Sequence, residues 1–369
     1  MVPVRLAAAQ ASFGHEAVVL AERDAAAEFP VPQLFAGVPG IDRVRHGWLP
    51  PARAFSPIRR AAVRSALDEQ LQSADIVHLH GIWAPIMAAS AGAARRRRIP
   101  YLVAPHGMLD PWSLSQKRLK KLMALALGWR KILNRAAAIH CLNSDERDLL
   151  SPLKLKSPSV IIPNGIFLDE VVPSDMHFSD GRPGLEGPKY ILFLSRLHFK
   201  KGLDILAEAF TAIAGRLTNV NLVIAGPDGG ARGEFEERIR AAKLTARVHL
   251  VGPLLGSTKW SALRDSACFC LPSRQEGFSI AILEALASRT PVVISSACHF
   301  PEVAEVQAGE ITPLSAADVA AALERVLTAD ESTRRRWGEA GRKLVEDRFT
   351  WRRAAQASIS VYKDARKAG

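Results

Sequence analysis

The sequence of 369 residues lacks any apolar run of the about 18–20 residues that a membrane-spanning helix requires. Cysteine is scarce: Cys141, Cys268, Cys270 and Cys298 are the only four, and none has the spacing of a zinc site. Cys268 and Cys270 alternate along a predicted strand, so we expect both to be buried thiols, and reduced cysteines are typical of a cytosolic protein. An Asp-x-Asp sequence is also missing, which excludes a metal site of that type. The opening apolar run is short and contains Gln10, which argues against a cleaved signal peptide.

Acidic residues are scarce in one stretch of the chain. Residues 95–135 hold eleven basic residues and one acid, Asp110, within a protein of net charge +12. Such a patch fits an anionic membrane, a phosphorylated substrate or nucleic acid, and a plain solvated face is the alternative. Because no recognisable nucleic-acid-binding module accompanies the patch, nucleic acid ranks last among these partners.

Length and apolar content favour two packed domains. Apolar residues make up 48% of the chain, and strand-like runs alternate with helical patterns, as in parallel α/β sheets. Residues 172–188 are rich in proline and glycine and have no periodicity, which predicts a linker. We therefore expect an N-terminal domain at 1–171, a C-terminal domain at 189–350 and a final helix at 351–369.

The most informative stretch joins a strand-like run at 267–271 to a helix. The loop between them holds Glu276 and Gly277. Free N–H groups and the positive dipole end at a helix start suit a diphosphate, and glycine lets such a ligand approach closely. Glu284 lies a little over two turns further on, so the two carboxylates suit hydroxyls at both ends of an elongated ligand. Solvated carboxylates on an ordinary helix are the alternative.

Two histidines follow the ends of successive strand-like runs. The run at 75–81 ends in His80 and Gly81. The run at 101–104 is followed by Pro105, His106 and Gly107, so a glycine comes after each histidine. Polar residues past the carboxyl ends of parallel strands are where open sheets bind ligands. A lone histidine is more often packed or exposed than catalytic. The repeat favours a functional role for His106 and leaves His80 open between function and packing.

Three other patterns concern structure more than chemistry. Residues 113–135 predict one basic helix with large apolar residues, which fits the surface of an anionic membrane; an ordinary amphipathic helix packed on the sheet is the alternative. Asn143 followed by Glu146 has the form of a capping box, which we interpret as structural. Residues 29–57 are rich in proline and glycine and predict a loop.

These motifs resemble those of the retaining group 1 (GT4) glycosyltransferases, and the resemblance covers nearly the whole chain. The stretch SRQEGFSIAILEALASRTPVV looks like the family's Glu-x7-Glu signature, with Glu276 and Glu284 as its carboxylates. The stretch SRLHFKKGLD resembles the family's Arg…Lys-Gly loop, with Arg196 and Lys201 matching. HGMLDPW is similar to text in group 1 transferases of surface-polysaccharide assembly.

The resemblance implies an α/β protein of the GT-B fold, with two Rossmann-like, doubly wound domains facing a central cleft. The first domain would bind the acceptor and the second the nucleotide sugar, and helix 351–369 would cross back to the first. In the family a strand and a glycine-rich loop normally precede the first helix. This sequence starts inside that helix, so we expect both to be missing.

The resemblance also implies an activity: retaining, metal-independent transfer of a hexosyl group from a nucleotide-diphosphate sugar, with no cofactor besides that donor. Glu276 would hold sugar hydroxyls and Glu284 the ribose. Arg196 and Lys201 would stabilise the leaving diphosphate, as a metal would. His106 would contact the transferred sugar. The other residues expected to bind substrate are Gly277, Phe278 and Ser279 through their amides, and His80 and Asn164.

HGMLDPW and the basic helix favour polysaccharide assembly on a lipid-linked glycan acceptor. The protein would then be cytoplasmic, with a peripheral place at the inner face of the cell membrane. A degenerate, non-catalytic homologue that binds a sugar nucleotide or a partner enzyme is the alternative, which the missing first strand and loop would favour. Intact Glu276, Glu284, Arg196 and Lys201 argue against it. A basic nucleic-acid-binding protein is the third hypothesis.

Overall fold

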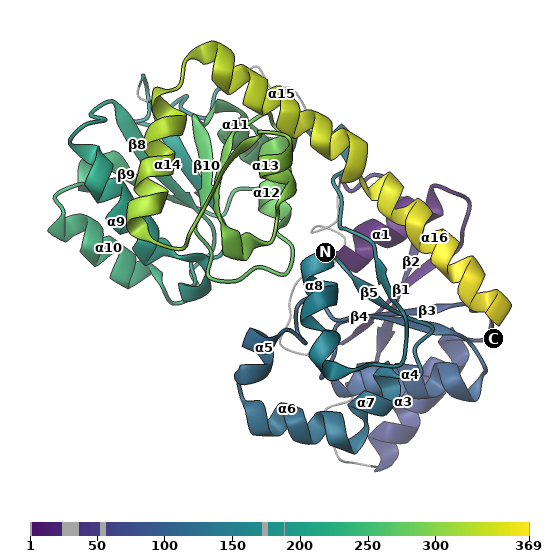
Figure 1. The fold of residues 1–369 in the computed structure, drawn as a ribbon. Helices are drawn as coiled ribbons and strands as arrows, with labels where there is room; N and C mark the ends of the chain where they lie inside the picture. The colour runs from purple at the N-terminus through teal and green to yellow at the C-terminus, as the bar shows by residue number, and fades with distance from the viewer. Residues whose placement is uncertain (1, 24–36, 52–56, 172–175, 188, 369) are drawn as a thin grey trace. The chain divides into compact units, whose positions relative to one another are not determined.

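The computed structural model describes residues 2–23, 37–51, 57–171, 176–187 and 189–368 (Figure 1). The chain forms two compact units. The first combines Met1–Phe167 with Trp351–Gly369, and the second is Leu168–Thr350.

The first unit is built on parallel strands in two sheets. In one sheet β1 pairs with β2, and in the other the order is β3-β4-β5-β6. All four residues of β4 and of β5 are buried, as expected for apolar strands covered on both faces. The strands are Ala17–Glu22 (β1), Val44–Leu49 (β2), Val77–His80 (β3), Tyr101–Ala104 (β4), Ala138–Cys141 (β5) and Ser159–Ile161 (β6).

Helices surround these sheets. The last helix of the chain, α16, lies beside the first, α1, and Trp351, Ala354 and Ala355 share an apolar cluster with Leu6 and Ala9 (Figure 1). The α-helices are Val2–Ala11 (α1), Pro57–Gln70 (α3), Pro85–Arg96 (α4), Pro111–Ser115 (α5), Arg118–Ala124 (α6), Arg130–Leu133 (α7), Ser144–Leu149 (α8) and Trp351–Ala368 (α16). A π-helical turn covers Leu125–Trp129 (η2), and 3-10 turns cover Ile41–Arg43 (η1), Ser151–Leu153 (η3) and, in the second unit, Leu168–Glu170 (η4).

Two sequence predictions in the first unit are wrong. Within the stretch predicted as a loop, residues 44–49 form β2; residues 29–36 and 52–56 of that stretch lie outside the described residues. The strand was missed because Gly47 weakens its pattern. A Cβ at Gly47 would lie 2.6 Å from Leu20 Cδ2, so a side chain there requires the end of Leu20 to turn away.

The basic helix predicted at 113–135 is broken into four short pieces. Lys117 adopts a left-handed φ of 53° between α5 and α6, and Gly128 has an extended backbone with φ 166°. A continuous α-helix cannot pass through either conformation. The apolar and basic residues of the stretch therefore do not form two faces of a single cylinder.

The second unit is one six-stranded parallel sheet in the order β12-β11-β10-β7-β8-β9. The chain starts at β7, builds outward through β8 and β9, then returns to the other side of β7 with β10. This reversal makes a switch point between β7 and β10, the place where open α/β sheets bind ligands. The strands are Lys189–Leu194 (β7), Val220–Ala225 (β8), Val248–Gly252 (β9), Cys268–Leu271 (β10), Val292–Ser295 (β11) and Gly309–Thr312 (β12).

Helices connect the strands of this sheet, and α14 crosses one face of it (Figure 1). The α-helices are Leu203–Ala214 (α9), Arg232–Ala241 (α10), Gly256–Asp265 (α11), Ile280–Ala287 (α12), Glu302–Glu305 (α13), Ala316–Thr328 (α14) and Glu331–Arg348 (α15). Short 3-10 turns cover Phe199–Lys201 (η5), Thr245–Arg247 (η6) and Ser296–Cys298 (η7).

The predicted linker falls partly outside the described residues, at 172–175 and 188. Residues 176–187 are described, and they pack on the second unit: Phe178 is 1% exposed, and its ring centroid lies 5.8 Å from that of Tyr190. The finer domain limits expected from the sequence stay a prediction.

Two expectations from composition can be compared with the described residues. All four cysteines are buried, which confirms the prediction for Cys268 and Cys270, and burial raises the pKa of the Cys268 and Cys298 thiols to about 12, so they stay protonated. Among the helices that the structure describes, none is both long and apolar enough to cross a bilayer.

Candidate active site

The loops that follow β7 and β10 meet at the switch point of the second unit. Lys201, from the loop after β7, donates a hydrogen bond of 2.5 Å from Nζ to Glu276 Oε1, from the loop after β10. Only 19% of the Lys201 side chain and 9% of the Glu276 side chain are exposed. Two residues predicted for the site from separate stretches of the sequence therefore form one partly desolvated ion pair.

A glycine allows these two loops to approach each other. Gly202 has a left-handed φ of 70°, and a Cβ there would lie 1.9 Å from the carbonyl oxygen of Pro272. Any other residue would push the loops apart. The Lys-Gly step of the first loop is thus explained by packing, and it places Lys201 against Glu276.

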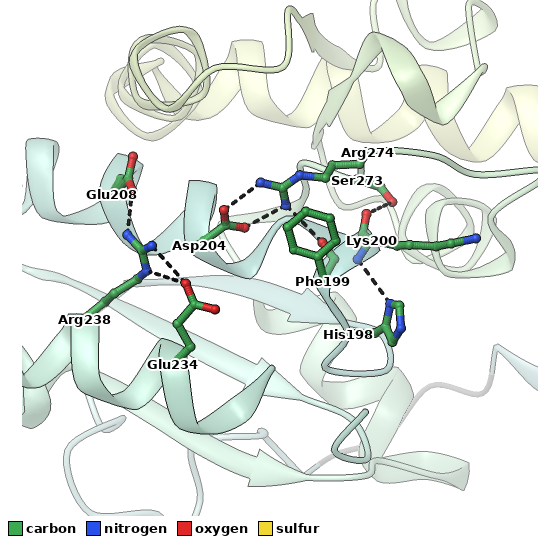
Figure 2. A network of polar contacts seen from close by, with 9 residues as sticks. All are labelled: His198, Phe199, Lys200, Asp204, Glu208, Glu234, Arg238, Ser273 and Arg274. Atoms are coloured by element: carbon green, nitrogen blue, oxygen red, sulfur yellow. Dashed lines mark hydrogen bonds and ion pairs between the residues drawn. The ribbon is translucent and has the colours of Figure 1, made fainter. Parts of the chain in front are cut away.

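Arg274, from the loop after β10, also contacts the loop after β7 and the start of α9 (Figure 2). Its guanidinium makes a bidentate ion pair with Asp204, through bonds of 2.8 Å and 2.6 Å. Its Nη1 also donates to Phe199 O at 2.9 Å, and its backbone N donates to Lys200 O at 2.7 Å. Burial works to raise the pKa of Asp204, but the hydrogen bonds and charge of Arg274 outweigh burial and lower it.

The same view contains a more exposed ion-pair cluster (Figure 2). Arg238 pairs with Glu208 at 2.7 Å and with Glu234 at 2.9 Å, and all three side chains are more than a third exposed. Ser273 belongs to the Arg274 cluster instead, since its Oγ donates to Lys200 O at 2.9 Å. The two clusters have similar chemistry and different burial.

Glu284 lies on α12, as the Glu-x7-Glu spacing predicts. Its Oε1 accepts a hydrogen bond of 2.6 Å from Lys259 Nζ, and the Glu284 side chain is 14% exposed. Lys259 also lies 4.3 Å from the ring centroid of Trp260. Sequence analysis missed Lys259 because α11 carries no recognisable motif.

The other residues that were predicted to bind the nucleotide sugar lie at the start of α12 and in the loop after β7. The Phe278 ring packs on Phe300 and Phe349, with ring centroids 5.7 Å and 6.0 Å apart. Ser279 is the N-cap residue of α12 and makes no side-chain capping bond. Arg196 is exposed, and its side-chain carbons cover Gly229.

In the first unit, four histidines gather at the strand ends. His80 Nδ1 and His106 Nε2 share a hydrogen bond of 3.0 Å, and the two rings are stacked. His78 shares one bond of 3.1 Å with His140 and another of 2.7 Å with the Tyr362 hydroxyl of α16. The predicted pair His80 and His106 is thus in contact, and His78 and His140 extend it.

This histidine cluster is kept uncharged. Burial lowers the pKa of His78 and His80 well below 6.5, and neighbouring histidines lower them further. Burial lowers the pKa of His106 to about 4, and it lowers the pKa of His140 against the opposing bond to Ile162 O. At neutral pH the cluster offers hydrogen bonds without positive charge.

His106 and Gly107 form a tight turn after β4. Their φ values of 52° and 72° are both left-handed, and Met108 N donates to Pro105 O at 3.1 Å. Gly107 N donates to Glu146 Oε1 at 2.6 Å. Asn143 caps α8, as its place before Glu146 predicts, since its Oδ1 accepts from Glu146 N at 2.7 Å.

Asn164 lies in the first unit, in the turn after β6, and is 4% exposed. Among the residues described, no group of three or more His, Cys, Asp or Glu side chains has the arrangement of a metal site. The predicted site residues therefore form two sets: Arg196, Lys201, Glu276 and Glu284 with the start of α12 in the second unit, and His80 and His106 with Asn164 in the first.

Comparison with known proteins matches both units. Residues 178–344 match the family described as glycosyl transferases group 1, and residues 2–165 match the glycosyl transferase 4-like domain. A phosphatidyl-myo-inositol mannosyltransferase of Mycobacterium leprae is 28% identical over 85% of this chain and 79% of its own length. The protein of the same name from Mycolicibacterium smegmatis is 32% identical over 58% of this chain and 54% of its own length.

A third relative is the lipopolysaccharide core biosynthesis mannosyltransferase LpcC of Rhizobium leguminosarum bv. viciae. It is 29% identical over 56% of this chain and 60% of its own length. The matches to the Mycolicibacterium smegmatis and Rhizobium proteins thus span less than two thirds of the relative's own length.

Solved structures share the fold. A glycosyltransferase from Rickettsia africae superposes with a TM-score of 0.79 at 17% identity, over 100% of this chain and 94% of that one. Anabaena HepE, solved in complex with UDP and glucose, gives 0.78 at 18% identity, over 98% and 95%. Two Rossmann-like units of this kind define the GT-B fold. The chain belongs to the group 1, GT4-like glycosyltransferases and is an enzyme of that family.

Proposed function

We propose that this enzyme transfers a hexosyl group, with retention of configuration, from a nucleotide-diphosphate sugar to a lipid-linked glycan acceptor. The observation that carries the proposal is the partly desolvated pair of Lys201 and Glu276 at the switch point of the second unit. A cation and a carboxylate held side by side suit a ligand with a diphosphate at one end and sugar hydroxyls at the other.

In the proposed reaction, the bond from the anomeric carbon to the diphosphate oxygen breaks, and its electron pair leaves with the diphosphate. The acceptor hydroxyl bonds to the anomeric carbon and releases its proton. Arg196, Lys201 and the amides of Gly277, Phe278 and Ser279 would stabilise the negative charge that develops on the leaving group. Because these groups supply positive charge, we propose that transfer needs no metal.

Glu276 would hold hydroxyls of the transferred sugar and Glu284 those of the ribose. When the donor binds, Lys201 would shift part of its interaction from Glu276 to the diphosphate, and Lys259 would keep Glu284 oriented. His106 would contact the transferred sugar as a neutral imidazole, with His80 and Asn164 supporting the acceptor side.

Mannose is the first donor sugar to test, because three of the matched relatives are named mannosyltransferases. The names of two of them also place their acceptors in a phosphatidylinositol and a lipopolysaccharide core. Both acceptors combine a polar head with lipid, which agrees with the lipid-linked acceptor proposed here.

We further propose that the broken basic segment 111–133 contacts the inner face of the cell membrane, on the cytoplasmic side. Leu119 and Leu127 are 77% and 86% exposed there, although both are large and apolar. Next to the end of this segment, a hollow of about 440 Å³ is lined by Ala126, Arg130 and Lys131 of the segment and by Asn134, Arg135 and Lys156 beyond it. Exposed apolar side chains next to cations match an anionic bilayer surface.

Vesicle sedimentation tests the membrane proposal. The variant K117Q/R118Q/K120Q should bind vesicles containing anionic lipid at least about tenfold more weakly than wild type, since each cation near the surface contributes about 1 kcal/mol. R240Q/K243Q/R335Q on the second unit removes the same charge and serves as the control. Equal binding by both triple variants would count against the proposal.

Sugar transfer itself is tested with GDP-mannose, UDP-glucose and ADP-glucose, each with a lipid extract as acceptor and with EDTA present. We expect one donor to release its nucleotide diphosphate faster when lipid is added. Nucleotide binding without turnover of any donor would favour the non-catalytic homologue instead.

A further inference from the structure

Glu146 is a buried carboxylate that no step of the proposed transfer uses. It lies on α8 and is 4% exposed. Its Oε1 accepts from Gly107 N and its Oε2 from Leu142 N, both at 2.6 Å. One side chain therefore links the loops that follow two neighbouring strands, β4 and β5.

The helix that carries Glu146 is capped by the side chain of Asn143, whose Oδ1 accepts from Glu146 N. Burying a carboxylate is unfavourable, and burial raises the pKa of Glu146, while the two N–H donors oppose the rise by stabilising the ion. An apolar side chain would pack there without that cost. An apolar side chain could not accept the hydrogen bonds that Glu146 accepts from Gly107 N and Leu142 N.

One of those bonds stabilises an unfavourable backbone turn. His106 is left-handed although it has a Cβ, a conformation that costs about 1 kcal/mol or more. The turn uses the N–H of Met108, which donates to Pro105 O, and leaves the N–H of Gly107 for another acceptor. Glu146 is that acceptor.

The His106 ring is fixed at its other end by His80, which shares a bond of 3.0 Å with Nε2. The backbone of His106 is thus held through Gly107 and Glu146, and its ring through His80. With Nε2 engaged, Nδ1 is the ring nitrogen that remains to face a substrate.

We infer that Glu146 is a positioning residue that sets the place of His106 by holding the N–H of Gly107. The inference rests on the proposed function, in which His106 contacts the sugar. Glu146 does not touch substrate itself, so its effect on transfer should pass entirely through His106.

Two variants probe this role at different strengths. In Glu146→Gln the amide oxygen accepts from only one N–H, and the amide NH2 faces the other donor; volume is kept. Glu146→Ala removes both acceptors. We expect turnover to fall roughly tenfold in E146Q and roughly a hundredfold in E146A, the order of loss that a displacement of about 1 Å causes.

Ser157→Ala is the matched control. Ser157 is buried in the same unit, and its Oγ lies 2.7 Å from the carbonyl oxygens of Leu133 and Ala136, before β5 begins. Glu146 instead accepts from Leu142 N, just after the carboxyl end of β5, so the two residues act at opposite ends of this strand. S157A should lower the unfolding temperature of the first unit and leave turnover per folded molecule within about twofold.

The decisive readout is a double-mutant cycle with His106→Ala. If Glu146 acts through His106, E146A should add less than about twofold to the loss caused by H106A alone. If the loss of turnover in the double variant equals the product of the losses in E146A and H106A, the inference is overturned. Wild-type turnover in E146A would overturn it as well. Nucleotide-diphosphate affinity, a property of the second unit, should stay within twofold of wild type in all these variants.

Amide hydrogen exchange keeps the inference testable without turnover. The Gly107 amide should exchange at least about tenfold faster in E146A, which removes both acceptors, than in wild type, and at the wild-type rate in S157A. Unchanged exchange in E146A overturns the inference by itself. Faster exchange together with undiminished turnover in H106A would instead contradict the role of His106 in the proposed function, and with it the positioning role.

Discussion

The two sets of site residues differ in charge: the set in the second unit contains ion pairs, and the set in the first unit is neutral. In the second unit, three carboxylates of the switch-point loops and of the helices that follow them face cations: Glu276 faces Lys201, Glu284 faces Lys259 and Asp204 faces Arg274. In the first unit, the histidine cluster is neutral and its members bond to one another. A ligand of the second unit can replace one ion of a pair, whereas a ligand of the first unit meets uncharged donors and acceptors.

This contrast suits the proposed division of roles. A diphosphate carries charge, so the loops that bind it hold cations whose charge is temporarily balanced by carboxylates. A sugar or acceptor hydroxyl is neutral, so a neutral imidazole can bond to it without a desolvated charge left behind. The following experiments each disturb one side of the contrast.

The largest effect is expected from Lys201→Ala. The substitution removes a cation proposed for the leaving group and leaves Glu276 buried beside an empty space. We expect transfer to fall about a thousandfold, as for loss of one strong transition-state donor. Lys200→Ala removes the neighbouring cation, which reaches Gln275 at 3.2 Å, and should cost less than about threefold. Similar losses in both variants would show that only net charge matters.

Acidification should destabilise the first unit. Burial lowers the pKa of His78, His80, His106 and His140 below their ordinary 6.5, so below that pH the unfolded chain binds more protons than the folded one. Stability then falls as pH falls. Each histidine that stays neutral contributes a loss of about 1.4 kcal/mol per pH unit, from about pH 6.5 towards pH 4.

Thermal unfolding at pH 7.5, 6.5 and 5.5 measures this loss. The variant His78→Gln, which keeps hydrogen-bonding groups near Tyr362 and His140, should reduce the slope by one histidine's share. A flat unfolding temperature over this range would contradict a neutral histidine cluster.

A smaller effect is expected from Arg274→Ala. Asp204 would lose both of its bonds to the guanidinium, and we expect a loss of about 2 kcal/mol in the free energy of unfolding of the second unit. Nucleotide-diphosphate affinity should also fall, because the loop that carries Lys201 is no longer held. Chemical denaturation and calorimetry measure the two quantities.

Arg238→Ala gives the smallest effect and serves as the comparison for Arg274. Its partners Glu208 and Glu234 are exposed, so its ion pairs are screened by water. We expect a loss of less than about 1 kcal/mol and unchanged nucleotide affinity. If Arg238→Ala destabilised the protein as much as Arg274→Ala, burial would not explain the difference between the two clusters.

The sequence could predict the elements whose patterns are local. The buried strands, the Glu-x7-Glu helix and the Lys-Gly loop follow from runs of fewer than about ten residues, and each lies where it was predicted. The broken segment at 111–133 was not predictable in this way, because one left-handed lysine and one extended glycine interrupt an otherwise helical composition.

Contacts between distant parts of the chain account for what was missed. His78 alternates with His80 along β3, which was a usable signal, but its partner Tyr362 lies 284 residues away. Glu146 was recognised beside Asn143, while the residue it holds, Gly107, is 39 positions earlier in another loop. Lys259 and Arg274 likewise pair with residues that no local pattern links to them.

The most direct test of the central claim is calorimetric titration of GDP, UDP and ADP, in the presence of EDTA, into the wild-type protein, Arg196→Ala and Glu284→Ala. One nucleotide diphosphate should bind the wild type selectively, and both substitutions should weaken its binding at least about tenfold, since each removes a charge-assisted contact. Binding of none of the three by folded wild-type protein, or binding by both variants as tight as that of wild type, would contradict a diphosphate site at the switch point of the second unit.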